Sequence, residues 1–154
     1  MAAMAWLFAE ISGAREPSQH DLKLFEIITA KLPERILDFL RNHDFGASYN
    51  DPGFAGVYDV AAWQGPRQEF IDKSLQKRWG MVQIEVTKFA NGLSLNTFPE
   101  GNADNWFTVH PTHGDPEIPE DFVQRRIDLL NRTATELAGH VDTFEHFARS
   151  RLKL

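Results

Sequence analysis

The segment MVQIEVTKFANGLSLNTF, residues 81–98, decides the fold that this sequence predicts. Asn91-Gly92 lies between two runs of alternating apolar and polar residues, which is typical of a β-hairpin with a two-residue turn. Such a turn needs positive φ at both central residues, and asparagine and glycine tolerate it. Since an isolated hairpin is only marginally stable in water, we expect helices to cover its apolar face. That face would consist of Val82, Ile84, Val86, Ala90, Leu93 and Leu95.

Helical signals are clear in the N-terminal part of the chain. Ser18 is a typical N-cap residue, and apolar residues recur from Leu22 to Leu32 at spacings of three and four. Pro33 cannot continue a helix, but it suits the first turn of a new one. Residues 18–43 therefore predict a pair of helices.

A second helical signal occupies the C-terminal part. Pro119 suits a first helical position, and an apolar residue then recurs every three or four positions from Val123 to Ala148. Gly139 lies inside this pattern and costs about 1 kcal/mol relative to alanine. Because the apolar stripe keeps its phase across Gly139, we expect one long helix.

The remaining segments give shorter elements. Residues 54–63 predict a strand, residues 67–78 a short amphipathic helix, and residues 106–110 a further strand. Residues 5–11 fit a short strand and a helical turn equally well, because seven residues are too few to separate the two periods.

Together these elements predict an α+β fold. We expect an antiparallel sheet of four to five strands packed against an N-terminal helix pair and a long C-terminal helix. The 154 residues correspond to one domain, 1–154, and are enough to bury a hydrophobic core.

Composition excludes several classes of function. The chain has no cysteine, which excludes disulfides, thiolate metal sites and cysteine nucleophiles. Its net charge of −6 argues against a nucleic-acid-binding surface, which is usually basic. No segment has the roughly 20 apolar residues of a membrane span, and the start lacks the basic region of a signal peptide. We therefore expect a cytoplasmic protein. No glycine-rich nucleotide fingerprint is present, so we also expect no cofactor.

One cluster offers a catalytic hypothesis. His110, His113 and Asp115 lie within six residues, and they could provide a general base with an orienting partner or part of a metal site. Their spacing differs from that of the helical two-histidine metal motif, so we predict no metal site. The alternative is structural: His110 ends a strand while polar side chains of the loop bond to the backbone. A small enzyme or ligand-binding domain that uses this loop is the second functional hypothesis.

Aromatic residues in turn-rich regions, close to acidic residues, give the first functional hypothesis. The aromatic residues would be the anchors of a protein-binding patch, and the acidic residues would form its rim. Burial in the core is the competing explanation for the aromatic residues. We therefore expect a small acidic protein-binding module rather than an enzyme, in its sharpest form an inhibitor or immunity-type protein for a basic toxin or nuclease. It would be a monomer or a weak homodimer through its C-terminal helix. The candidate residues are Tyr49, Asp51, Phe54, Asp59, Trp63, Glu100, Asp104 and Trp106.

Overall fold

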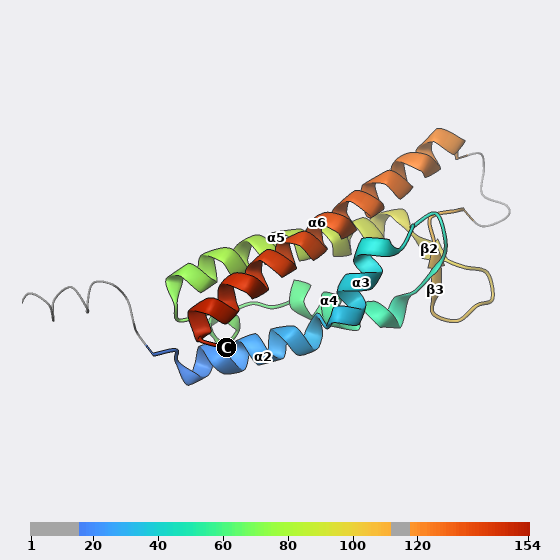
Figure 1. Cartoon of the computed structure of the whole chain (residues 1–154). Coiled ribbons are helices and arrows are strands. Elements are labelled where there is room, and N and C mark those ends of the chain that lie inside the picture. The colour runs from blue at the N-terminus through green and yellow to red at the C-terminus, as the bar shows by residue number, and fades with distance from the viewer. Residues whose placement is uncertain (1–15, 112–117) are drawn as a thin grey trace, which may run out of the picture.

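The structure is a computed structural model, and it describes residues 16–111 and 118–154. In these ranges five α-helices enclose a hydrophobic core (Figure 1). The two longest, α5 (Lys73–Asn96) and α6 (Glu120–Leu152), lie antiparallel and make the most extensive contact. Helix α3 (Glu34–Asn42) packs on α6 and α4 (Ala55–Ala61) on α5, while α2 (Gln19–Lys31) contacts α4 and α6. The core is therefore mainly a contact between helices, and the predicted α+β fold, a sheet backed by helices, is wrong.

A small antiparallel sheet closes one end of this helical body. Its strands are β1 (Tyr49–Asn50), β2 (Phe98–Pro99) and β3 (Trp106–Thr108), in the order β1-β3-β2. Tyr49 pairs with Phe107 in this sheet. The strand predicted from Trp106 is thus present but shorter, whereas the predicted sheet of four to five strands is wrong.

The predicted hairpin at residues 81–98 is wrong because this segment forms most of α5. A helical periodicity is superimposed on the alternating one, and it extends further along the chain. Gly92 does not occupy a turn: it lies against α6, where a methyl group would come within 3.2 Å of Leu130 Cδ2. Its small size thus serves helix packing rather than positive φ. The buried stripe consists of Leu75, Trp79, Val82, Val86, Phe89 and Leu93.

The strand predicted at 54–63 is also wrong. This region contains the end of a 3₁₀ turn, η1 (Asp51–Phe54), followed by α4. Val57 and Val60 point into the core at helical spacing, so one face of α4 is buried. Gly56 lies directly against the carbonyl oxygen of Lys31, and a methyl group there would overlap that oxygen. Gly56 is thus the point where α4 and α2 approach each other.

Both terminal helical predictions are confirmed. The helix pair at residues 18–43 corresponds to α2 and α3, and Ser18 Oγ accepts a hydrogen bond of 3.0 Å from the Asp21 amide as the N-cap of α2. The C-terminal helix is one continuous helix that includes Gly139. The helix predicted at 67–78 is correct only in its second half, because α5 begins at Lys73 after a second 3₁₀ turn, η2 (Pro66–Gln68). Residues 5–11 lie outside the described part of the chain.

Two aspartates connect three helices at the end of the molecule opposite the sheet. Asp21, on α2, is 3% exposed, and its two carboxylate oxygens accept hydrogen bonds from the amides of Ile71 (2.7 Å) and Asp72 (3.0 Å). Asp72 caps α5 by accepting from two amides of its first turn. The same side chain accepts a 2.7 Å hydrogen bond from Arg151 Nε near the end of α6. The start of α2, the start of α5 and the end of α6 are thereby held together.

Acidification should weaken this end of the molecule through Asp72. Burial raises the pKa of its carboxyl group, but hydrogen bonds from Arg151 and from the amides of Leu75 and Ser74 outweigh burial, so the folded-state pKa lies below the ordinary value. The unfolded chain therefore takes up this proton first as pH falls. The stabilisation is complete above about pH 4 and is lost as pH falls through the folded-state pKa.

We expect Asp72→Asn to lower the free energy of unfolding at pH 7 by at most about 1 kcal/mol, because the ion pair is partly exposed. Asparagine still caps a helix, so the substitution isolates the charge. Urea denaturation at pH 7 and pH 3 should show a smaller loss on acidification for the variant than for the wild type. An identical loss in both proteins would contradict the assignment to Asp72.

Candidate protein-binding groove

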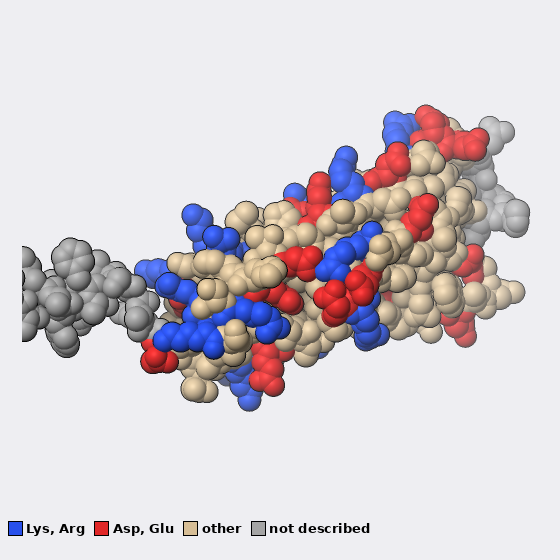
Figure 2. Space-filling view, viewed as in Figure 1, with Lys and Arg blue, Asp and Glu red and all other residues tan. Residues whose placement is uncertain are grey.

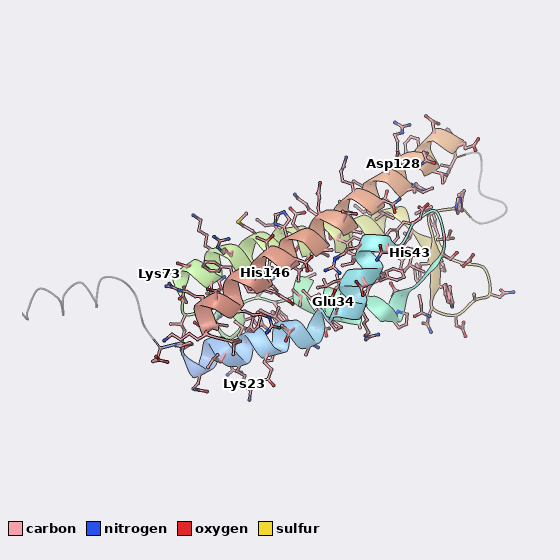
Figure 3. All side chains as sticks on the ribbon, viewed as in Figure 1. Lys23, Glu34, His43, Lys73, Asp128 and His146 are labelled. Atoms are coloured by element: carbon pink, nitrogen blue, oxygen red, sulfur yellow. The ribbon has the colours of Figure 1, made fainter. Side chains whose placement is uncertain are left out.

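An open groove of about 460 Å³ lies where α3, β1 with η1, and β3 meet. Its apolar part consists of Ile36 and four aromatic residues: Phe39, Tyr49, Phe54 and Trp106. Polar groups on the α3 side include Arg35 and His43. Figure 3 shows His43 at the end of α3, next to the loop that leads into the sheet.

The floor of this aromatic groove is fixed by ring-to-ring packing. The Phe54 ring lies 5.5 Å from that of Phe39 and 5.4 Å from that of Tyr49, both in edge-to-face arrangements. Phe39 also stacks on His43 at 4.3 Å. Tyr49 and Phe54 are buried, while 42% of Trp106 remains exposed. The groove thus combines a rigid aromatic floor with one exposed aromatic edge.

Two phenolic hydroxyl groups hold the surroundings of the groove in place. The Tyr49 hydroxyl lies 3.0 Å from Thr97 Oγ1, and Tyr58 donates a 2.6 Å hydrogen bond to Asp51 Oδ1. Burial raises the pKa of Tyr49, and burial together with Asp51 raises the pKa of Tyr58 well above its usual range. Both phenols are therefore protonated at neutral pH, and Tyr58 keeps the Asp51 carboxylate beside the groove.

The turn between β2 and β3 positions Trp106. The amide of Glu100 donates to the Trp106 carbonyl oxygen at 2.8 Å, and the amide of Asp51 donates to the Asn105 carbonyl oxygen at the same distance. Asn105 has a φ of 67°, a conformation that asparagine tolerates better than most residues. Glu100 and Asp104 belong to this turn, so the chain segment that leads into Trp106 is acidic.

Three of the eight residues predicted to bind a partner line the groove, and three more belong to the segments next to it. Tyr49, Phe54 and Trp106 line the groove, and Asp51, Glu100 and Asp104 belong to the segments beside it.

The other two lie elsewhere. Asp59, on α4, forms an ion pair with Lys31. Trp63 is half-buried, with its ring centre 6.1 Å from that of Trp79.

Sequence reasoning missed the contribution of α3. Arg35, Phe39 and His43 follow one another at intervals of four, so they share one face of this helix beside the buried stripe. Their spacing of four was the signal in the sequence, and in the structure Arg35 is exposed while Phe39 and His43 are half-buried.

The His110 cluster is only partly described. The His110 ring donates from Nε2 to the Gly46 carbonyl oxygen at 2.9 Å, and its amide donates to Thr108 Oγ1. These contacts connect the end of β3 to the loop after α3, which is a structural role. His113 and Asp115 lie outside the described residues. Within residues 16–111 and 118–154, no group of three histidine, aspartate or glutamate side chains is placed to hold a metal ion.

The function is proposed from the geometry of the surface, because comparisons with known proteins give no match. In the described part of the chain, no helix is apolar over a length sufficient to cross a bilayer. No family model, no curated protein and no solved structure matches this sequence. Of the residues singled out from the sequence, Tyr49, Phe54 and Trp106 line the aromatic groove.

Proposed function

We propose that the protein binds another protein, and that the aromatic groove is its docking site for an apolar side chain of that partner. The supporting observation is the exposed Trp106 next to the packed floor of Phe39, Tyr49 and Phe54. Residues that contribute most to protein–protein affinity are enriched in tryptophan and tyrosine, and they cluster in well-packed pockets. A rigid floor also reduces the entropy lost when a partner side chain is fixed.

Charge around the groove favours a basic partner. Asp51, Glu100 and Asp104 belong to the segments that adjoin the groove, Arg35 lines its α3 side, and the chain as a whole carries −6. We therefore propose an apolar anchor flanked by basic residues. An inhibitor or immunity-type protein for a basic toxin or nuclease, acting in the cytoplasm, is the sharpest form of this proposal. Complementary charge would mainly accelerate association.

Trp106→Ala should weaken partner binding at least about 30-fold, which corresponds to a hot spot of about 2 kcal/mol. The fold should be preserved because Trp106 is partly exposed on a short strand. Affinity capture from the source organism with wild-type and Trp106→Ala protein would identify proteins that only the wild type retains. Binding of the purified partner to each protein then gives the two dissociation constants.

Phe122→Ala is the matched control, because Phe122 is also an exposed aromatic residue but lies on α6, outside the groove. Its dissociation constant should equal that of the wild type. Charge reversal at Asp104 should act on the association rate, and this effect should fade at high salt. Equal affinity of the wild type and Trp106→Ala for every captured partner would overturn the groove as the docking site.

A further inference from the structure

The outward side of α5 carries a charge opposite to that of the whole chain. The basic residues of this helix, Lys73, Lys77, Arg78 and Lys88, are all exposed, while its single acidic residue, Glu85, is buried. In Figure 2 basic side chains gather where α5 begins and α6 ends. Only Lys88 is paired within the helix, by a 3.0 Å contact with Glu85. A chain with net charge −6 therefore presents a locally positive helix.

The same side of α5 also exposes apolar residues. Met81 is 50% exposed, Ile84 57% and Leu95 78%, and helical spacing places them along one line on the helix. A groove of about 440 Å³ between α5 and α6 lies beside Met81. Another of about 460 Å³, toward α4, lies beside Ile84. The α5 face, as we call this line with its two grooves, is thus an apolar ridge between two hollows.

Two glycines within these helices have no explanation in internal packing. Gly80 lines the groove toward α4, and Gly139 lines the groove toward α6. A methyl group at either position would meet no described atom within 4 Å, whereas at Gly56 and Gly92 it would meet Lys31 and Leu130. Both positions weaken their helices relative to alanine. What they provide is backbone that an approaching chain can contact closely from outside.

We propose that the α5 face binds an acidic amphipathic helix of a partner protein, at a site separate from the aromatic groove. Apolar side chains of that helix would enter the hollows on both sides of the Met81–Ile84 ridge, as ridges and grooves interlock when helices pack. Its acidic residues would pair with Lys73, Lys77 and Arg78, which face solvent. Among the described residues, Glu136 is the one acidic residue that lines these grooves, against Arg78 and Lys88, so the charge of the α5 face favours a partner of opposite sign.

Charge and shape favour this occupant over two others. A second copy of the chain that docked through its own α5 would offer no free acidic side chain of that helix, because Glu85 is buried and paired with Lys88. A lipid surface would touch the exposed ridge but leave the hollows beside Gly80 and Gly139 unfilled. An amphipathic helix fills both hollows and satisfies the basic residues.

The test uses the full chain and a synthetic peptide of about five helical turns, with leucine on one face and glutamate on the other. A peptide with lysine in place of glutamate is its control. In an NMR titration, we expect the acidic peptide to shift amides of α5 and those around Gly139, with binding at least about tenfold tighter than that of the lysine peptide. Lys77→Glu should weaken the acidic peptide at least about tenfold. Lys23→Glu, which changes an exposed lysine on α2, should leave the affinity for the acidic peptide unchanged.

Gly80→Ala separates a binding role from a structural one. It should raise the melting temperature, because alanine is the better helix former and finds open space, yet weaken the acidic peptide at least about fivefold. A lowered melting temperature would assign the glycine to internal packing and overturn its place in the proposal.

Other outcomes would overturn the whole proposal. One is that the acidic peptide does not bind at about 1 mM. The others are that the lysine peptide binds with equal affinity, or that the shifted amides lie outside the α5 face. Binding to phosphatidylglycerol vesicles without binding of the peptide would assign the face to a membrane. Self-association that Ile84→Asp abolishes would assign it to a second copy. None of these results depends on Trp106, so the proposed function of the aromatic groove is tested separately.

Discussion

Replacing Gly56 with alanine should lower the free energy of unfolding by about 3 kcal/mol. Helices α2 and α4 approach each other at this residue, and the added methyl group would overlap the carbonyl oxygen of Lys31. Because the obstructing atom belongs to the backbone, no side-chain rotation relieves the overlap, and the two helices must move apart. Their separation would also loosen the packing of Val57 and Val60 beneath α4. Urea denaturation of the variant and the wild type measures the loss.

Gly53→Ala is the matched control for this experiment. Gly53 lies close by in η1, and a methyl group there meets no described atom within 4 Å. Its stability should stay within about 0.5 kcal/mol of the wild type. If Gly56→Ala were as stable as Gly53→Ala, the close approach of α2 and α4 would be wrong.

Asp21→Ala should cost about 3 kcal/mol, for a different physical reason. The substitution removes the acceptors of the Ile71 and Asp72 amides, and these donors are then left without partners at a buried site. Asp21→Asn keeps one acceptor oxygen and should cost roughly half as much. Denaturation gives the stabilities, and hydrogen exchange should accelerate at the Ile71 and Asp72 amides more than in the middle of α5.

Slow exchange at these two amides in Asp21→Ala would contradict the role of the carboxylate. A loss of stability in Asp21→Asn equal to that in Asp21→Ala would indicate that the charge of Asp21, rather than its geometry, holds the segment before α5.

The helices at the two ends of the chain could be predicted because their signals are local. Ser18 caps α2 within its own first turn, and the apolar stripe of α6 keeps one phase across Gly139. Such features depend on near neighbours in the sequence, so periodicity and capping rules identify them.

Helix α5 could not be predicted in this way because two periodicities overlap in it. Val82, Ile84 and Val86 alternate as in a strand, but Val82 and Val86 also belong to a helical stripe that begins at Leu75. Contact with α6 stabilises the helix, and Gly92 lies against Leu130 from that distant segment. Such tertiary packing overrides the local preference of Asn91-Gly92 for a turn.

The two candidate surfaces were predictable to different degrees. Aromatic residues near turns indicated Tyr49, Phe54 and Trp106, although the pairing of β1 with β3 that brings them together is long-range. The α5 face was hidden by the hairpin, which placed Ile84 and Leu95 in the core. Both residues are largely exposed, because on a helix they lie away from the buried stripe.

The position of the C-terminus affects how the protein can be joined to others. Lys153 Nζ lies 2.8 Å from Glu16 Oε1, so the chain ends beside the start of α2, at the opposite end from the sheet and the aromatic groove (Figure 1). The 33 residues of α6 span about 50 Å between these ends. A flexible linker reaches such an average span only with several tens of residues. A protein fused at the C-terminus therefore leaves the groove open. If its linker is shorter than this, the effective concentration of the fused protein at the groove stays low.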